Sequence, residues 1–191
     1  MKPTHILPVL LFATAFAQGI ARADVYDRLL ADQSTLTFTF RQMNVPVEGR
    51  LDKFGAQLSF DPVRPEQAKA NLDIDLANID AGSDEANDEV SGRQWLDTKR
   101  YPVARFVATS VRSLDGKRFE IVGQLTIKGH TQAATAFASF QARENLGVLD
   151  GSLTINRADF SIGEGPWADF GTLANEISVR FRFVLGATPH E

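Results

Sequence analysis

Strict alternation of apolar and other residues is the feature that most constrains what this chain can fold into. The clearest run, residues 176–186, places five large apolar residues at every second position: Ile177, Val179, Phe181, Phe183 and Leu185. A period of two residues is typical of a strand with one buried face, whereas a helical period would scatter the same residues around a cylinder. The pattern therefore predicts a β-strand.

The same alternation recurs and predicts about eight strands, near residues 34–43, 46–60, 70–80, 103–114, 117–128, 132–143, 147–157 and 176–186. Turn-forming residues separate several of them, at 115–116, 128–131 and 145–147. Many short strands with one apolar face form either a sandwich or a closed barrel. We favour an all-β, eight-stranded antiparallel β-barrel, because closure removes exposed sheet edges.

Two segments break the alternation. Residues 83–100 are polar and predict one short helical segment near residues 84–98, with Asn87 as a helix cap, although two short turns fit the same residues. Residues 163–171 form a long Gly-rich loop that carries two aromatic side chains, Trp167 and Phe170. Both segments interrupt a single domain, since no linker or repeat divides the chain.

The first 23 residues are interpreted as an export signal. Ile6 to Phe16 is almost continuously apolar, and Ala21-Arg22-Ala23 supplies the small residues that precede a signal-peptidase site. The apolar run is shorter than the roughly 20 residues that cross a bilayer, so an uncleaved membrane anchor is the less favoured alternative. We predict cleavage after Ala23, a periplasmic location and one domain at residues 24–191.

The composition excludes several function classes. After removal of residues 1–23, 18 Lys and Arg face 24 Asp and Glu, a net charge of −6. A nucleic-acid partner is not expected, because such partners are recognised by clustered basic residues. The chain has no cysteine, which excludes thiolate chemistry and a lipoprotein anchor. Twelve of its 14 Phe follow residue 23 and must line a core, a cavity or both.

No catalytic or metal-ligating spacing stands out. The two histidines after residue 23, His130 and His190, lack a partner at metal-binding spacing, and no nucleophile elbow or phosphate-binding loop is present. The acidic residues within 84–89 lack the spacing of a calcium loop and favour a solvated face. We therefore expect no enzyme activity, no catalytic residue, no cofactor and no metal site.

Arg157 has two interpretations at this stage. It can pair with Asp159, two residues later, and so hold the end of a strand. Alternatively, its planar guanidinium can face the acidic head group of a ligand, whose geometry it suits. The sequence leaves both open.

Four segments resemble the YceI-like family of periplasmic polyisoprenoid-binding proteins. The most specific is WLDTKRYPVARF at residues 95–106, which matches that family's aromatic-Leu-Asp and Tyr-Pro motifs. VGQLTIKGHT at 122–131, NRADFSIG at 156–163 and FGAQLSFD at 54–61 resemble further motifs in the same order. The likeness spans residues 32–186. The segment FRQMNVPVEG at 40–49 and the WAD at 167–169 indicate a distinct branch, whose ligand can differ in length or head group.

The resemblance implies a lipocalin-like barrel that holds a long-chain apolar lipid, such as a polyprenyl or quinone-like molecule. Burial of each CH₂ group contributes about 0.8 kcal/mol, so such a chain can bind without polar contacts. Inward parity selects the candidate ligand-facing residues Phe38, Phe40, Phe60, Phe106, Phe119, Leu125, Phe137, Phe181 and Phe183. Trp95 and Trp167 are candidates at the cavity mouth, and Arg157 for the head group.

The leading hypothesis is therefore a non-catalytic carrier or store of an isoprenoid-type lipid, with a membrane protein as a candidate donor or acceptor. The alternative is a protein-interaction or stress-response module that assists a membrane redox partner. In that case the barrel would be a solid core, and the loop with Trp167 and Phe170 would be the contact surface. An enzyme acting on the lipid is the third hypothesis, and pairing of two barrels as a homodimer stays open.

Overall fold

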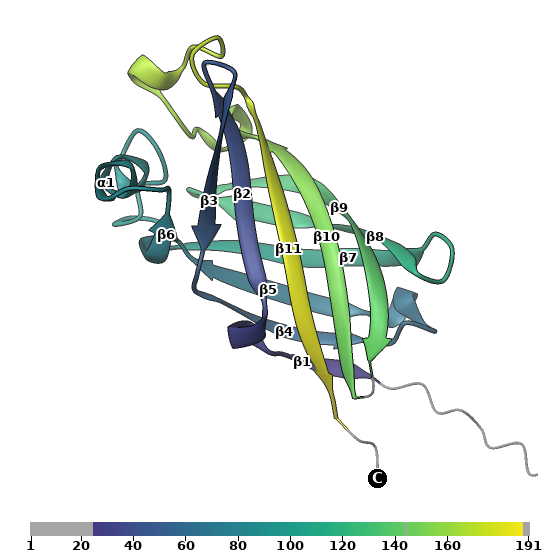
Figure 1. Ribbon diagram of the computed structural model, residues 1–191. Helices are drawn as coiled ribbons and strands as arrows, with labels where there is room; N and C mark the ends of the chain where they lie inside the picture. The colour runs from purple at the N-terminus through teal and green to yellow at the C-terminus, as the bar shows by residue number, and fades with distance from the viewer. Residues whose placement is uncertain (1–24, 144, 189–191) are drawn as a thin grey trace, which may run out of the picture.

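The computed structural model describes residues 25–143 and 145–188, in which eight antiparallel strands close into a barrel (Figure 1). The strands follow the order β1-β4-β5-β7-β8-β9-β10-β11, and pairing of β1 with β11 completes the ring. Their bounds are Tyr26–Leu29 (β1), Phe54–Phe60 (β4), Lys69–Asp75 (β5), Val103–Ser113 (β7), Arg118–Ile127 (β8), His130–Arg143 (β9), Leu146–Asn156 (β10) and Glu176–Ala187 (β11). The predicted eight-stranded antiparallel barrel is confirmed.

Three further strands extend the sheet from β11: Thr35–Gln42 (β2), Val45–Leu51 (β3) and Ile79–Asp80 (β6). On the edge opposite β10, strand β11 has two partners, since residues 185–187 pair with β1 and residues 178–182 with β2. Ser34 spans the break between those partners. Its Oγ donates to the Leu30 carbonyl (2.8 Å) and accepts from the Val184 amide (2.9 Å).

The predicted strands differ from the structure in three places: two are divided and one was missed. Residues 46–60, expected as one strand, divide into β3 and β4 at Asp52 and Lys53, which interrupt the alternation with two exposed charges. Residues 70–80 divide into β5 and β6, because Leu76–Asn78 forms a 3-10 turn. Strand β1 was not predicted, since four residues are too few to show a period of two.

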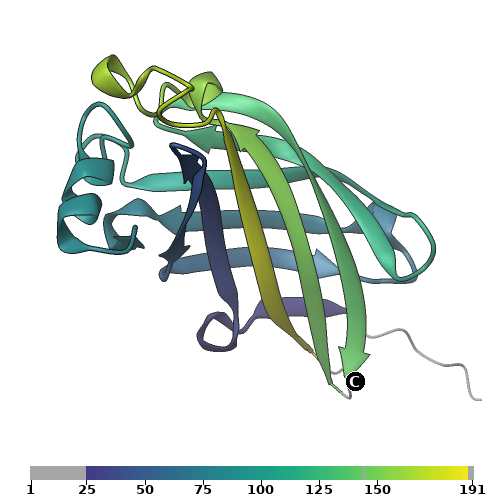
Figure 2. The same cartoon turned by 45° about the horizontal axis from the view of Figure 1, so that its top comes forward.

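A single α-helix in the described residues, α1 (Asp84–Ser91), lies against one end of the barrel (Figures 1 and 2). It is capped by Ser83, whose Oγ accepts from the Ala86 amide (3.2 Å). The predicted cap, Asn87, instead accepts from the Ala81 amide within the preceding loop (2.6 Å). The helical segment is therefore shorter than the predicted 84–98. Single 3-10 turns occur at Ala31–Gln33, Pro65–Gln67, Leu76–Asn78, Arg157–Phe160 and Gly165–Trp167.

Tight turns connect the long strands. Lys128 and Gly129 join β8 to β9 with φ values of 51° and 77°, and Met43 and Asn44 join β2 to β3 with 48° and 65°. Two consecutive left-handed residues define the type I′ turn, whose twist matches that of antiparallel strands. The predicted turn at 115–116 lies between β7 and β8 and is confirmed, whereas the turn predicted at 128–131 covers only 128–129 because β9 begins at His130. The turn between β9 and β10 includes residue 144, outside the described residues.

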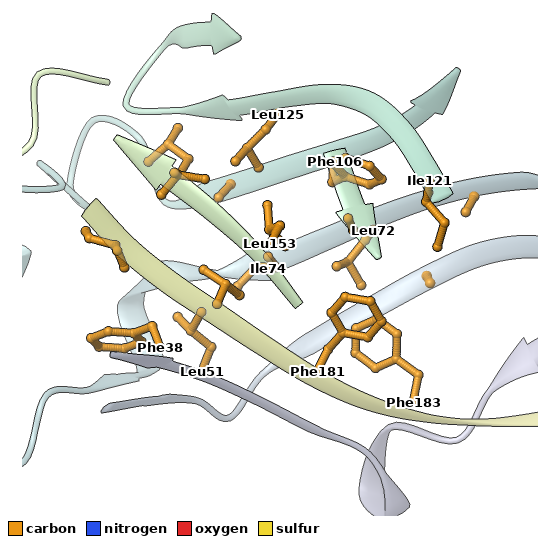
Figure 3. A pocket seen from close by; sticks show the side chains of 18 of the residues that line it. Phe38, Leu51, Leu72, Ile74, Phe106, Ile121, Leu125, Leu153, Phe181 and Phe183 are labelled. Atoms are coloured by element: carbon orange, nitrogen blue, oxygen red, sulfur yellow. The ribbon is translucent and has the colours of Figure 1, made fainter. Parts of the chain in front are cut away.

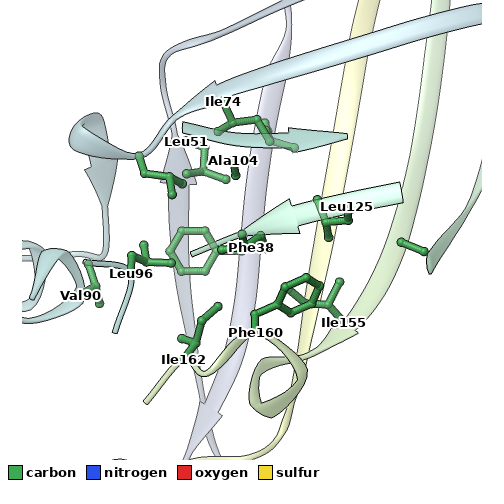
Figure 4. Close-up of a cluster of buried hydrophobic side chains, with 14 of the residues drawn as sticks. Phe38, Leu51, Ile74, Val90, Leu96, Ala104, Leu125, Ile155, Phe160 and Ile162 are labelled. Carbon is green, nitrogen blue, oxygen red and sulfur yellow. The ribbon is translucent and has the colours of Figure 1, made fainter. Parts of the chain in front are cut away.

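Buried side chains gather at both ends of the barrel. At one end, the base cluster (Tyr26, Phe60, Val111, Phe119, Phe140 and Leu185) packs its rings edge to face, with ring centres 5.0–5.3 Å apart. At the other end, Val90, Leu96, Phe160 and Ile162 pack onto the barrel residues Phe38 and Leu125 (Figure 4). We call α1, residues 92–101 and residues 157–175 the cap.

The predicted export signal and its cleavage site, residues 1–23, lie outside the described residues. Across residues 25–143 and 145–188, no helix has both the length and the apolar character that a bilayer crossing requires. The barrel is the main body of the fold, and its interior contains the candidate site.

Candidate binding cavity

An apolar cavity runs through the barrel between the base cluster and the cap (Figure 3). Its volume is about 230 Å³, and the surface that faces it is apolar throughout. Along β8 its lining extends from Phe119 to Ile127, a span of eight residue steps that corresponds to about 27 Å of extended strand. The cavity is therefore elongated.

The structure brings ten of the 12 predicted site residues to this cavity. They are Phe38, Phe40, Phe60, Trp95, Phe106, Phe119, Leu125, Arg157, Phe181 and Phe183. Nine of the 12 were chosen by inward parity: Leu125 and eight phenylalanines. Leu125 and seven of those phenylalanines point inward, as their strand positions predict. Trp167 does not line the cavity but packs behind Trp95, with their ring centres 5.4 Å apart.

The predicted inward orientation of Phe137 is wrong. Its side chain is 53% exposed, whereas its neighbours Ala136 and Ala138 are buried. The inward face of β9 is built from alanines at positions 134, 136 and 138, with Phe140 following at the base, so the predicted parity of Phe137 was that of the wrong face. Small inward side chains leave room in the barrel, so β9 contributes space to the cavity and little bulk.

The predicted site residues omit most of the aliphatic side chains that line the cavity. Inward strand parity, which selected the phenylalanines, could have found them as well. Many of these side chains keep accessible surface while pointing inward, because they face the cavity and not a packed neighbour. Such half-buried lining residues include Leu58, Leu72, Ile79, Ile121, Leu149, Leu153, Ile177 and Val179.

Four phenylalanine rings lie flat against glycines on the neighbouring strand. A Cβ atom on Gly151 would fall 2.3 Å from the Phe181 ring, and one on Gly49 would fall 2.2 Å from the Phe38 ring. Phe106 with Gly123 and Phe140 with Gly147 repeat the arrangement at 2.4 Å. Because glycine has no side chain, each ring can lie against the backbone of the neighbouring strand. The rings therefore stay close to the barrel strands.

Arg157 is buried at the cap end, and neither sequence interpretation describes it. Its five N–H groups donate to the carbonyls of Ala174, Ile162, Gly163, Trp167 and Leu173 at 2.7–3.1 Å. The predicted pairing with Asp159 is therefore wrong, and no N–H donor is left for a ligand head group. Burial lowers the pKa of the guanidinium, partly offset by Asp169, yet a guanidinium stays charged in a protein.

One carboxylate oxygen joins α1 to the late loop. Glu89 Oε1 accepts the indole N–H of Trp95 (3.1 Å) and that of Trp167 (2.7 Å). The sequence predicts a solvated acidic face for Glu89, and no sequence signal relates it to Trp167, 78 positions away. The two tryptophans expected at the cavity mouth therefore meet, although only Trp95 reaches the cavity.

A buried lysine fastens the same loop to the barrel. The Lys128 ammonium, 8% exposed, donates to the Ser161 carbonyl (2.6 Å) and to Glu164 Oε2 (2.8 Å). The hydrogen bond and charge of Lys128 hold the pKa of the Glu164 carboxyl below its usual value, helped by His130 and Arg93. This contact and those of Arg157 order the segment between β10 and β11.

The described residues contain no group of three or more His, Asp or Glu side chains placed to hold a metal ion. The chemistry that this site offers is the burial of apolar surface. An elongated, apolar space without an aimed polar group suits a hydrocarbon chain and selects mainly on width and length.

Comparison with known proteins settles the family. The model of the YceI-like domain matches residues 28–185. This chain belongs to the YceI-like family. A family member from Pseudomonas putida strain F1, the "UPF0312 protein", is 33% identical over 140 residues, covering 70% of this chain and 72% of its own length.

Solved structures of the YceI-like fold agree with the barrel described above. BcnA from Burkholderia cenocepacia is 36% identical and superposes with a TM-score of 0.79 over 82% of this chain and 98% of its own. A polyisoprenoid binding domain from Saccharophagus degradans is 18% identical, with a TM-score of 0.67 over 87% of this chain and all of its own. At that identity the second match shows the fold alone.

Proposed function

We propose that this YceI-like protein binds a long-chain isoprenoid-type lipid, polyprenyl or quinone-like, in the barrel interior and carries or stores it without catalysing a reaction. The elongated apolar cavity is the observation that carries the proposal. The description of the Saccharophagus degradans domain as polyisoprenoid binding supports it. The predicted export signal adds the location: the carrier would act in the periplasm, between membranes that contain such lipids.

The alternative of an interaction module with a solid core fits less well. A cavity of about 230 Å³ contradicts the solid core on which that alternative depended. The loop with Trp167 and Phe170 is nevertheless present, and Phe170 is exposed on it.

Native mass spectrometry of the protein from its own compartment, followed by organic extraction, tests the proposal. We expect a lipid in a 1:1 ratio with the protein, and the same spectrum reports whether two barrels pair. An empty protein that also rejects added long-chain isoprenoids would overturn the proposal.

A matched pair of substitutions in β9 connects the lipid to the cavity. Ala136 lines the cavity, whereas Ala133 lies on the exposed outer face of the same strand. Ala136→Phe should fill part of the interior and displace most of the lipid, at an overpacking cost of about 1–3 kcal/mol in stability. Ala133→Phe should leave the lipid content unchanged. Equal lipid content in the two variants, both folded by circular dichroism, would place the lipid outside the barrel.

A further inference from the structure

Three exposed apolar side chains form a rim at the cap end of the barrel. Met43 is 70% exposed, Val45 61% and Phe170 52%. Met43 lies in the β2–β3 turn, Val45 is the first residue of β3 and Phe170 lies in the late loop. Both Figure 1 and Figure 2 place the β2–β3 turn and the late loop at the same end of the molecule. The Met43 amide donates to the Thr172 carbonyl (2.8 Å), so the two segments are joined directly.

The rim is built at some cost to the fold. Met43 has a left-handed backbone, φ 48°, in a turn where Asn, Asp or Gly is preferred. Phe170 lies over the Arg157 guanidinium, 5.1 Å from its ring centre, and so rests on the most heavily hydrogen-bonded side chain of the cap. The exposure of these residues is thus a product of an ordered structure, and an apolar side chain at a strained, exposed turn favours a contact function.

The cavity ends directly behind the rim. Leu173 and Phe40 line the cavity, and each is close in sequence to a rim residue. A backbone bridge pairs Leu173 with Gln42, next to Met43. The charges in these two segments nearly balance once Lys128, which pairs with Glu164, is counted with them. Three basic residues then face four acidic ones: Arg41, Lys128 and Arg157 against Glu48, Asp159, Glu164 and Asp169.

We propose that the rim of Met43, Val45 and Phe170 is a membrane-docking surface that enters the interface of a lipid bilayer and presents the cap end of the cavity to it. The inference rests on the proposed function, since an isoprenoid-type lipid resides in a bilayer and its carrier must meet one. The balanced charge indicates a surface that engages neutral lipid and does not depend on anionic head groups. Val63 and Leu114, also exposed, lie in other turns and are not part of the rim.

Partition of the purified chain, without residues 1–23, onto phosphatidylcholine vesicles tests the proposal. The rim variant Met43→Asn/Val45→Thr/Phe170→Gln should partition at least about tenfold more weakly, because little apolar surface is left to bury. The control variant Val63→Asn/Val103→Thr/Phe137→Gln removes side chains of 73%, 44% and 53% exposure elsewhere and should partition like the parent. Raised salt or added anionic lipid should change the parent's partition by less than about twofold.

The transfer of a fluorescent isoprenoid between vesicles provides a second measurement. The parent's transfer rate should rise with acceptor-vesicle concentration, as contact requires, and the rim variant should be slower while binding the same lipid delivered in detergent. Should Phe170→Gln disturb the cap, Met43→Asn/Val45→Thr retains the test, because Asn suits a left-handed turn residue.

The outcomes separate the two proposals. Equal partition of rim variant and parent, or a lipid-loaded parent that stays off vesicles, overturns the docking surface and leaves the carrier function standing. Capture of a protein by the rim without vesicle binding also overturns it. A parent that docks through the rim yet holds no lipid contradicts the carrier function alone.

Discussion

The two ends of the barrel are closed by different interactions. At the base, interlocked aromatic rings fill the space, and Phe119 is fully buried there. At the cap, apolar packing by residues such as Phe160 and Ile162 is joined by polar contacts: Arg157 through five carbonyls, Lys128 through Glu164, and Glu89 through two indoles. Rings that pack together resist separation in any direction, whereas directed hydrogen bonds can be exchanged for water one group at a time.

This difference assigns separate roles to the ends. The base belongs to the cooperative core, so its loss should unfold the whole barrel. Because the cap is held in part by separate hydrogen bonds, we expect it to open with the strand ladders intact and to be the end through which a ligand passes. The docking rim lies at the cap end and agrees with this assignment.

The largest expected effect lies at the base. Phe119→Ala removes a fully buried ring that meets Phe60 edge to face and should lower the free energy of unfolding by about 3–5 kcal/mol. Urea unfolding followed by circular dichroism measures it. Phe137→Ala, on the outer face, is the control and should stay within about 0.5 kcal/mol of the parent. Similar decreases in the free energy of unfolding for Phe119→Ala and Phe137→Ala would mean that the base cluster does not stabilise the barrel more than an exposed side chain does.

The next effect should be local to the cap. Arg157→Met leaves five buried or half-buried carbonyls without their donor and should cost about 2–4 kcal/mol. Arg157→Lys keeps the charge but lacks the planar fork, so it should rescue only part of the loss. Hydrogen exchange should accelerate across residues 158–175 and remain slow in β8 and β9. Uniform acceleration throughout the barrel would show that cap and base unfold together.

A smaller effect is expected at the Glu89 junction. Glu89→Ala removes the shared acceptor of two indoles and should cost about 1 kcal/mol, since the carboxylate is solvent-accessible. Both tryptophans of the chain lie here, so fluorescence reports on the cap alone, and its emission should shift to longer wavelength. Glu89→Gln retains an acceptor oxygen and is the matched control. An unchanged Glu89→Ala spectrum would argue against the junction.

The smallest effect is the pH dependence of the Lys128–Glu164 pair. The folded pKa of Glu164 lies below its usual 4.5, so the pair stabilises the fold above that pH and the contribution fades as the pH falls below it. Glu164→Gln should therefore be slightly less stable than the parent at pH 7, by below about 1 kcal/mol because the carboxylate is 56% exposed. Thermal unfolding should show the gap closing below pH 4.5. A gap that widens in acid would reverse the sign and refute the pairing.

Parity arguments recovered much of the cavity because strand geometry is local. Phe181 and Phe183 were assigned inward from residues 176–186 alone, and the structure agrees. The same reasoning failed at Phe137, which was assigned the inward parity of β9 although the buried positions of that strand are those of Ala136 and Ala138. It also could not find the Gly151–Phe181 contact, because strand register depends on which strands become neighbours.

The sequence by itself determined the all-β class, seven of the eight barrel strands, the turns that join the long strands, and the family. These features follow from short-range periodicity, backbone preferences and motifs that a linear chain displays. Only the tertiary structure decided that β11 would serve both β1 and β2, that Arg157 would bind carbonyls and not a carboxylate, and that Glu89 would meet Trp167. The strand pairings and the Glu89 contact join residues far apart in the sequence, and the Arg157 contacts depend on how the loop that follows it folds back over the guanidinium. No local pattern encodes which groups these tertiary arrangements will place within hydrogen-bonding distance.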